Sequence, residues 1–259
     1  MQTKLSKTNQ SVKKTMMLVE IMAMHNEPMK LQSISEEADI PASTTLRMLN
    51  TLLEMGYVNQ NKDTLRYSLS LKFAYIGEQV KRQANITQIS HSYLIELSST
   101  VGECSCLAIE ENKEILYLDV ISNQANNILT TTQRIGKRAP LFCTGIGKLL
   151  LTNYTPNELV NYSQSTPFLP FTPKTITSLA ALNLELEKIR EQGYALDNEE
   201  CDQGAKCIAA PIYDYSGKII AGISITAPSV RLQSERIEVI LPILLETAKK
   251  ISISLGYTG

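Results

Sequence analysis

The segment from Lys30 to Leu69 constrains the fold more than any other part of this chain. Its first half predicts two short helices joined by a tight turn. Ser33-Ile34-Ser35-Glu36 has the form of a capping box, which predicts a helix that starts at Ser33 and runs through Ala38. Ile40-Pro41 then predicts a turn, because the residue before a proline disfavours helical backbone.

The second helix is expected over residues 42–55. Gly56 is placed to stop it, and four leucines at helical spacing predict its buried face: Leu46, Leu49, Leu52 and Leu53. Two strand-like runs, residues 57–60 and 65–69, follow around a polar tip. With a further helix expected over residues 11–25, this is the order of a winged helix-turn-helix, a module that places its second helix in the major groove of DNA.

A change of pattern predicts a second domain after residue 85. We expect a winged helix-turn-helix at residues 1–70, a linker helix at 71–85 and a second domain at 86–259. In the second domain, helices are expected at residues 144–153, 155–162, 178–192 and 233–255, and strands at 104–110, 114–120, 127–133, 206–214 and 218–226. The whole is an α+β protein whose second domain has a mainly antiparallel, GAF/PAS-like sheet covered by helices.

Charge and composition narrow the class of protein. Residues 1–85 carry 11 Lys and Arg against 8 Asp and Glu, whereas the remainder carries 14 against 18. The mildly basic first part suits a phosphate backbone. No run of about 18 apolar residues is present, so no membrane span is expected. Five cysteines and a polar start without a secretion signal predict reduced thiols in the cytoplasm.

Two ordered blocks in the second half resemble the IclR (isocitrate lyase regulator) family of bacterial transcription factors. The first is APLFCTGIGKLLL at residues 139–151, and the second runs from GYALD at 193–197 through CIAAPI at 207–212 to ISITAP at 223–228. The resemblance covers roughly residues 10–255. It implies a homodimer or dimer of dimers that binds operator DNA under the control of a small metabolite, often a carboxylate, without a cofactor.

The exposed face of the second helix supplies the expected DNA contacts. The N-terminal part of a recognition helix meets base edges, and Arg47 is the best candidate for a bidentate contact to guanine. A phosphate contact or a solvated surface charge is the alternative for Arg47, and a solvated strand-edge charge is the alternative for the wing residues. The candidate DNA-binding residues are Ser43, Thr44, Thr45, Arg47 and Asn50 on the helix, with Lys62 and Arg66 on the wing.

Three segments of the second domain supply a candidate effector pocket. Gly145 and Ile146 stand where the chain enters a helix, whose backbone N–H groups suit an anion. Ser224 and Thr226 alternate along a strand, so both hydroxyls point to one face. By resemblance, Asp197 and Cys207 join them, with Cys143 near the position of the family's usual His. Leu129, Leu141 and Leu149 are candidates for an apolar wall, although a place in the ordinary core is favoured for any one of them.

Plainer roles stay open for the polar members of this set. Asp197 could accept turn hydrogen bonds, the two hydroxyls could bond neighbouring backbone, and Cys207 could be an inert buried thiol. A zinc site formed by Asp197 with Cys143, Cys201 and Cys207 lacks CxxC spacing or a His pair. Cys104 and Cys106 are expected to point in alternating directions along a strand, which suits chelation poorly. No metal is therefore expected.

Two other functions compete with a ligand-controlled regulator. One is a cysteine-dependent enzyme, but nucleophilic cysteine needs a nearby base, and the second domain has only His91. The other is a sensor module whose winged helix contacts protein. Catalytic residues are therefore not assigned, and the sequence leaves the effector, the operator and the choice between repressor and activator undecided.

Overall fold

The computed structural model describes residues 8–83, 85–122 and 135–259. The chain divides into two compact units, with the boundary after Gln83. The expected linker helix falls within the first unit by this division. Among the described residues, no helix combines the length and apolarity needed to cross a bilayer.

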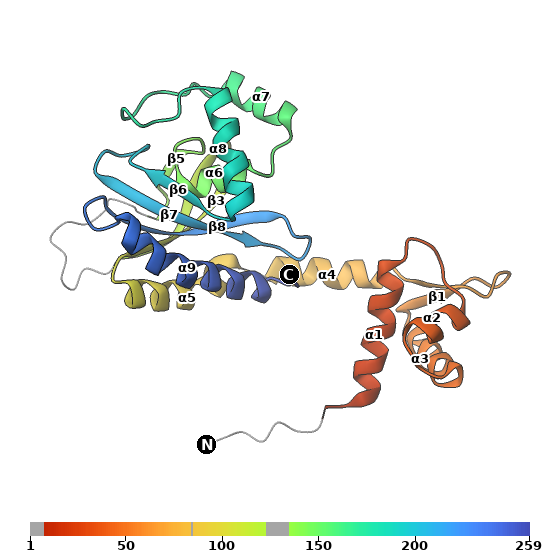
Figure 1. The fold of residues 1–259 in the computed structure, drawn as a ribbon. Helices are drawn as coiled ribbons and strands as arrows, with labels where there is room; N and C mark the ends of the chain where they lie inside the picture. Colours follow the sequence, from red (N-terminus) through yellow and green to blue (C-terminus); the bar gives the residue numbers. More distant parts are fainter. Residues whose placement is uncertain (1–7, 84, 123–134) are drawn as a thin grey trace, which may run out of the picture. The chain divides into compact units, whose positions relative to one another are not determined.

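The first unit is a winged helix-turn-helix followed by one more helix (Figure 1). Its elements are α1 (Gln10–Met24), α2 (Leu31–Glu37), α3 (Ala42–Glu54), β1 (Val58–Gln60), β2 (Tyr67–Leu69) and α4 (Lys72–Gln83). Strands β1 and β2 pair antiparallel as the wing. Leu18 of α1, Ile34 of α2 and Leu49 of α3 are fully buried in one shared core. The three helices therefore pack around a common core, although the spacing of apolar residues predicted only part of their buried faces.

The start of α2 differs from the expected capping box. The N-cap is Lys30, three residues before the expected N-cap Ser33, so the helix begins at Leu31, and Lys30 makes no side-chain hydrogen bond there. Glu36 accepts a hydrogen bond from the Gln32 side chain instead. Ser35, inside the helix, donates to the carbonyl of Ile40 at 2.6 Å. Ser35 thus stabilises the turn after the helix rather than its start.

The second unit is a six-stranded antiparallel sheet between two layers of helices. The strands are β3 (Cys104–Glu111), β4 (Glu114–Ile121), β5 (Arg138–Pro140), β6 (Ala195–Asn198), β7 (Ala205–Tyr213) and β8 (Ile219–Pro228), and their order across the sheet is β5-β4-β3-β8-β7-β6. The helices are α5 (Ile86–Val101), α6 (Gly145–Leu151), α7 (Pro156–Ser165), α8 (Leu179–Gln192) and α9 (Ser234–Ser254).

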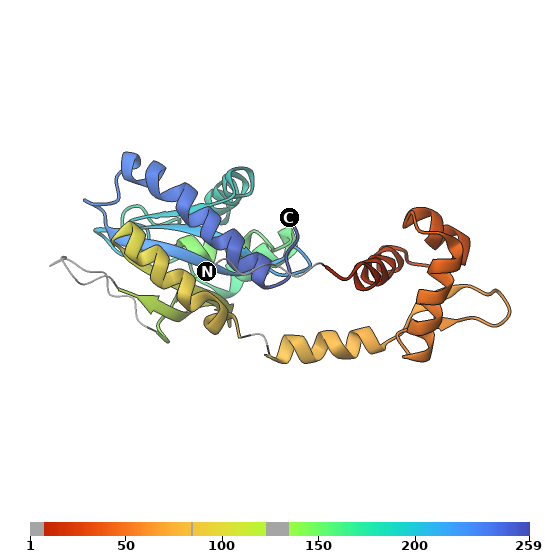
Figure 2. The same ribbon diagram turned by 90° about the horizontal axis from the view of Figure 1, so that it is seen from below.

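The helices of the second unit divide between the two faces of the sheet. Helices α5 and α9 lie side by side across one face, as Figures 1 and 2 both show, whereas α6 covers the other face with α7 and α8 beyond it. Two hydrophobic cores result, one on each face. The expected α+β fold with an antiparallel sheet and helical layers is confirmed.

Strand alternation assigns each residue of β8 to one of the two cores. Ala221, Ile223 and Ile225 are fully buried against α5 and α9. The residues that alternate with them along the strand face α6, and they are Gly222, Ser224 and Thr226. The expectation that both hydroxyls point to one face is confirmed, because their neighbours belong to the core of the other face.

Two edge strands were not expected from the sequence. Both β5 and β6 are short and lie at opposite edges of the sheet. The strand expected at residues 127–133 lies outside the described residues.

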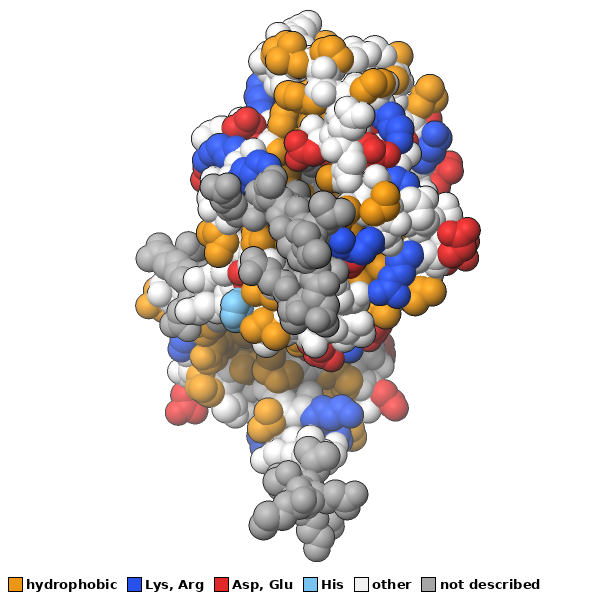
Figure 3. All heavy atoms as spheres, turned by 90° about the vertical axis from the view of Figure 1, so that its left-hand side faces the viewer, with side chains coloured by type: hydrophobic (Ala, Val, Ile, Leu, Met, Phe, Trp, Pro, Cys, Tyr) orange, Lys and Arg blue, Asp and Glu red, His pale blue; other side chains and the backbone are white. Residues whose placement is uncertain are grey.

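Figure 3 shows one face of the molecule, on which basic, acidic and hydrophobic side chains are mixed, so the coloured residues there form no broad patch of one charge.

Candidate functional site

The exposed face of α3 carries three of the predicted DNA contacts. Ser43, Arg47 and Asn50 are all exposed, and their spacing places them on one side of the helix. Thr44 is half-buried beside them. Arg47 also borders a shallow groove that Val12 and Met16 of α1 line. The aliphatic part of the Arg47 side chain therefore has apolar neighbours, while the residue stays exposed to solvent.

Two residues of α3 face opposite to expectation. Thr45 is fully buried and its hydroxyl donates to the carbonyl of Ile40 at 3.4 Å, so it holds the turn and is not accessible to DNA. Leu46 was expected in the core but is 38% exposed. Both differences have one cause: the buried face of α3 is centred on Thr45, Leu49 and Leu52, which turns Leu46 outward.

The two basic residues of the wing differ, because Lys62 is exposed whereas Arg66 bonds to the backbone. Lys62 is exposed at the tip, where the Asn61 side chain accepts hydrogen bonds from the backbone of Asp63 and Thr64. Arg66 is half-buried and donates to the carbonyl of Pro28 at 2.9 Å, which ties the wing to the segment after α1. The sequence did not reveal this second role of Arg66.

In the second unit, one row of side chains crosses four strands on the α6 face. Register pairs Cys104 of β3 with Thr226 of β8, Thr226 with Cys207 of β7, and Cys207 with Asp197 of β6. The next row on the same face pairs Cys106 with Ser224. Directly opposed residues on neighbouring strands lie close together, so the structure brings these predicted residues into one site.

The two hydroxyls in these rows lack hydrogen-bond partners. Ser224 and Thr226 are 1% and 2% exposed, and within the described residues neither Ser224 Oγ nor Thr226 Oγ1 makes a hydrogen bond of ordinary geometry. Both hydroxyls nevertheless lie close enough to the Cys207 thiol to oppose the rise that burial causes in its pKa. A buried hydroxyl without a partner costs about 1–3 kcal/mol. Such groups are rare in folded proteins and call for a specific explanation.

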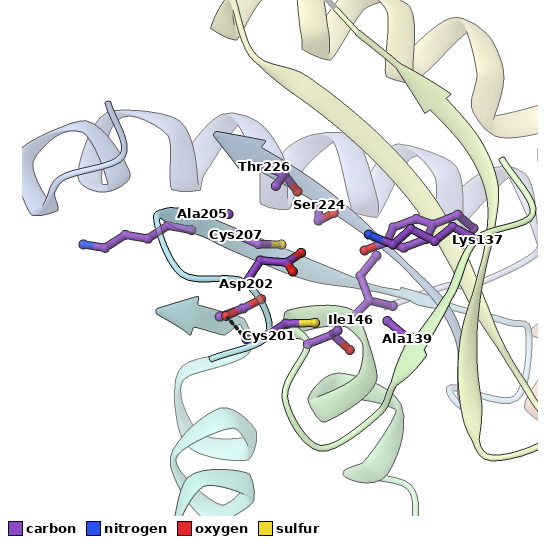
Figure 4. Close-up of a pocket in the computed structure, with 14 residues that line it drawn as sticks. Lys137, Ala139, Ile146, Cys201, Asp202, Ala205, Cys207, Ser224 and Thr226 are labelled. Carbon is purple, nitrogen blue, oxygen red and sulfur yellow. Dashed lines mark hydrogen bonds between the residues drawn. The ribbon is translucent and has the colours of Figure 1, made fainter. Parts of the chain in front are cut away.

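Both hydroxyls line an interior cavity (Figure 4). Six of the ten predicted effector residues line it: Gly145, Ile146, Asp197, Cys207, Ser224 and Thr226. Its volume is about 20 Å³, which suffices for about one water molecule. A metabolite would therefore need the walls of the cavity to move apart.

Asp197 is both a turn acceptor and a member of the cavity wall. One of its oxygens, Oδ1, accepts hydrogen bonds from the backbone N–H groups of Glu200 at 2.7 Å and Cys201 at 3.4 Å. Burial raises the pKa of Asp197 to about 7, and the negative charge of Glu200 adds to the rise, although the hydrogen bond from Glu200 N opposes it. The side chain therefore carries a proton for much of the time near neutral pH.

A buried ion pair holds the turn that follows Asp197. Lys148 of α6 is fully buried and donates to Glu200 at 2.6 Å and to Glu185 of α8 at 3.4 Å. Burial raises the pKa of Glu200, while the Lys148 ammonium opposes the rise. Lys148 thus joins α6 and α8 to the β6–β7 turn. The sequence block at residues 139–151, which contains Lys148, did not predict this role.

Close packing against the sheet explains the glycines of α6. A Cβ at Gly145 would lie 3.1 Å from the Cβ of Ala209, and one at Gly147 would lie 2.4 Å from backbone atoms of Leu141. Thr144 Oγ1 caps the helix by accepting from Gly147 N. These glycines therefore let a short helix approach the strands and the preceding loop closely.

Three of the predicted pocket residues belong to the core instead. Leu141 and Cys143 are fully buried and do not line the cavity, because the loop before α6 folds beneath that helix. Leu149 is likewise core. Leu129 lies outside the described residues.

Three of the five cysteines, Cys106, Cys143 and Cys207, are buried thiols. Burial raises the pKa of Cys207 to about 12, and the charge of Asp197 contributes, so the nucleophilic thiolate is disfavoured. The expectation that Cys104 and Cys106 diverge is wrong, since residues two apart on a strand share a face and their sulfurs are 3.7 Å apart. Within the described ranges, no group of three or more His, Cys, Asp or Glu is arranged to hold a metal ion.

Further wall residues were not predicted. The additional residues that line the cavity are Tyr117, Lys137, Ala139, Thr144, Cys201, Asp202, Ala205 and Lys206. Tyr117 and Lys137 come together only through the pairing of β4 with the chain entering β5, where Tyr117 N donates to Lys137 O at 3.1 Å. A short edge strand leaves little signal in a sequence, so this wall was not foreseeable.

Comparison with known proteins agrees with both units. Residues 11–62 match the IclR helix-turn-helix domain, and residues 78–253 match the model described as bacterial transcriptional regulator IclR C-terminal. The chain is 35% identical to the HTH-type transcriptional regulator KdgR of Escherichia coli, over 88% of this chain and 86% of that protein.

Solved structures of full-length proteins show the same relationship. IclR of Thermotoga maritima has a TM-score of 0.62 at 32% identity, covering 95% of this chain and 99% of that one. The repressor BlcR of Agrobacterium tumefaciens has a TM-score of 0.78 at 25% identity, covering 98% and 100%. The chain therefore belongs to the IclR family of bacterial transcriptional regulators.

Proposed function

We propose that this regulator binds operator DNA through α3 and the wing, and that a small carboxylate in the α6-face cavity controls that binding. The observation that carries the effector half is the pair of buried hydroxyls, Ser224 and Thr226, that face the cavity without partners. A ligand that accepts or donates hydrogen bonds there would remove a cost of about 1–3 kcal/mol for each hydroxyl. Because these hydrogen bonds form only when the ligand is bound, they would stabilise the liganded conformation relative to the unliganded one.

The DNA half rests on the accessible face of α3. We assign Ser43, Arg47 and Asn50, which are exposed, to contacts with base edges, and Lys62 to a contact with a DNA phosphate. Arg66 would contact the DNA backbone in addition to its hydrogen bond to Pro28. One winged helix reaches few phosphates, so we propose that two or four copies act together on a palindromic site. A regulator of transcription acts where the chromosome lies, which in a bacterium is the cytoplasm.

Gel-shift and footprinting with the DNA upstream of the chain's own gene test the DNA half. Arg47→Ala should weaken specific binding about 10- to 100-fold, the loss expected for one bidentate base contact. Lys249→Ala removes the same charge from an exposed site in the other unit and should bind as the wild type does. An unchanged footprint with Arg47→Ala would reject the assigned role.

Thermal denaturation with a panel of small carboxylates and sugar acids tests the effector half. An acid that binds the cavity should raise the melting temperature of the wild type, and Ser224→Ala and Asp197→Ala should lose the rise. Ser254→Ala is the matched control, because Ser254 is exposed at the end of α9. If the rise persists in Ser224→Ala and Asp197→Ala alike, the effector binds elsewhere.

A further inference from the structure

The cavity contains a basic side chain at one end. Lys137 stands just before β5, and strand alternation places it on the same side as Ala139, which also lines the cavity. Arg138, between them, points away and pairs with Glu111. Figure 4 shows the Lys137 side chain extending toward Ser224. Its ammonium has no hydrogen-bond or ion-pair partner among the described residues.

The other charges near the cavity are committed, exposed or directed elsewhere. Lys148 is occupied by Glu200 and Glu185. Lys206 borders the cavity, but it alternates with Cys207 along β7, so its side chain is directed toward the opposite face of the sheet. Asp202 is exposed at the rim, where water screens its charge. Lys137 is therefore the cation, within the described residues, that a ligand in this cavity would meet.

The topology separates Lys137 from the acidic end of the site. β5 and β6 are the two edge strands of the sheet, so Lys137 approaches from one edge and Asp197 from the other. The hydroxyls of Ser224 and Thr226 lie on β8, between the two edges. A ligand that fits this order has an anionic group at the Lys137 end and uncharged polar groups along the hydroxyls.

We propose that Lys137 determines specificity for a negatively charged effector, and that the effector is a small hydroxy acid. The ammonium holds the acid group, and Ser224 and Thr226 bond the hydroxyl-bearing remainder. Charge-assisted hydrogen bonds are stronger than neutral ones, so the acid group contributes most of the affinity. This inference rests on the proposed function of the cavity, and it adds which residue recognises the charge and which class of ligand is accepted.

Two matched pairs of probes test the inference by calorimetric titration: D-glycerate with glycerol, and D-gluconate with D-glucitol. Within each pair the acid and the neutral polyol differ mainly in charge. The wild type should bind at least one acid at least 10-fold more tightly than its polyol. Lys137→Met should weaken that acid about 10- to 100-fold and leave the polyol unchanged. Lys137→Arg, which keeps the charge, should recover most of the loss.

Lys218→Met is the control, because Lys218 is exposed at the β7–β8 hairpin and its loss removes the same charge. Lys218→Met should bind the acid as the wild type does. Equal binding of acid and polyol by the wild type, binding of neither acid, or full acid affinity in Lys137→Met would each overturn the inference.

Ser224→Ala separates this inference from the proposed function. Loss of acid binding in both Lys137→Met and Ser224→Ala supports both. Loss in Ser224→Ala alone keeps the cavity but removes the role of Lys137. Loss in Lys137→Met alone keeps the charge selection and rejects the hydroxyls as ligand contacts.

Discussion

The same strands form both faces of the six-stranded sheet, but one face packs into an apolar core and the other borders a cavity. On the face under α5 and α9, β8 contributes Ala221, Ile223 and Ile225, all fully buried in an apolar core. On the face under α6, the alternating residues Ser224 and Thr226 are equally buried but leave their hydroxyls without partners. Along β8, one face therefore contributes apolar burial, and the other gives up some stability around a cavity, as binding sites commonly do.

The buried ion pair of the α6 face gives the largest expected effect. Lys148→Ala should lower the free energy of unfolding by about 3–5 kcal/mol, because it leaves the Glu200 carboxylate buried without its cation. Denaturant unfolding measures the change. Lys188→Ala is the control, since Lys188 is mostly exposed and lies 3.9 Å from Glu185, so little change is expected. A loss in Lys148→Ala no larger than that of the control would refute this role.

Neighbouring residues of β8 contrast the two faces directly. Ile225→Ala should cost about 2–5 kcal/mol, since it opens a cavity in the apolar core under α9. Thr226→Val, one residue further along and on the other face, replaces an unpartnered hydroxyl by a methyl group of similar size and should cost nothing or stabilise. Comparable losses in both variants would remove the distinction between the faces.

The pH dependence of stability should reveal Asp197. Its pKa is about 7 in the folded state against an ordinary 3.8. The folded protein keeps a proton that the unfolded chain has lost in this range, so the contribution of Asp197 to stability falls as pH rises from about 4 to 7 and stays low above 7.

Asp197→Asn should therefore stabilise the unliganded protein by about 2–4 kcal/mol at pH 8 and have little effect at pH 4. Asn can still accept the hydrogen bond from Glu200 N. Asp202→Asn, at an exposed position, is the control and should change neither value. A variant that is less stable than the wild type at pH 8 would show that the carboxylate form is favoured in the fold.

The smallest expected effect is a gain. Ser224→Ala should raise the free energy of unfolding of the unliganded protein by about 1 kcal/mol, because it removes a buried hydroxyl without a partner. Thermal denaturation measures the gain. A loss of stability would mean that Ser224 already has a partner, such as an ordered water molecule, in the empty cavity.

Period-two alternation made part of this site predictable. The spacing of Ser224 and Thr226 alone placed both hydroxyls on one face, and the resemblance to the family added Asp197 and Cys207 to them. The structure then supplied the cross-strand register that joins these residues in rows. Local pattern therefore fixed side-chain direction, whereas pairing between strands far apart in the sequence was not foreseeable without the family.

The failures have the complementary cause. Lys137 enters the site only through pairing at an edge strand, and Leu141 and Cys143 leave it because the loop before α6 folds under the helix. In the first unit, the rotation of α3 about its axis decides that Thr45 is buried and Leu46 exposed. Such rotations depend on tertiary packing, which a pattern of leucines does not determine.

The central claim is that the hydroxyls of Ser224 and Thr226 on the α6 face form hydrogen bonds with the effector that controls DNA binding. The direct measurement is the affinity for operator DNA of the wild type and of the double variant Ser224→Ala/Thr226→Val, each titrated with an acid that alters DNA binding by the wild type. We expect the double variant to bind DNA normally and to lose the response to the acid. A full response in the double variant would contradict the account.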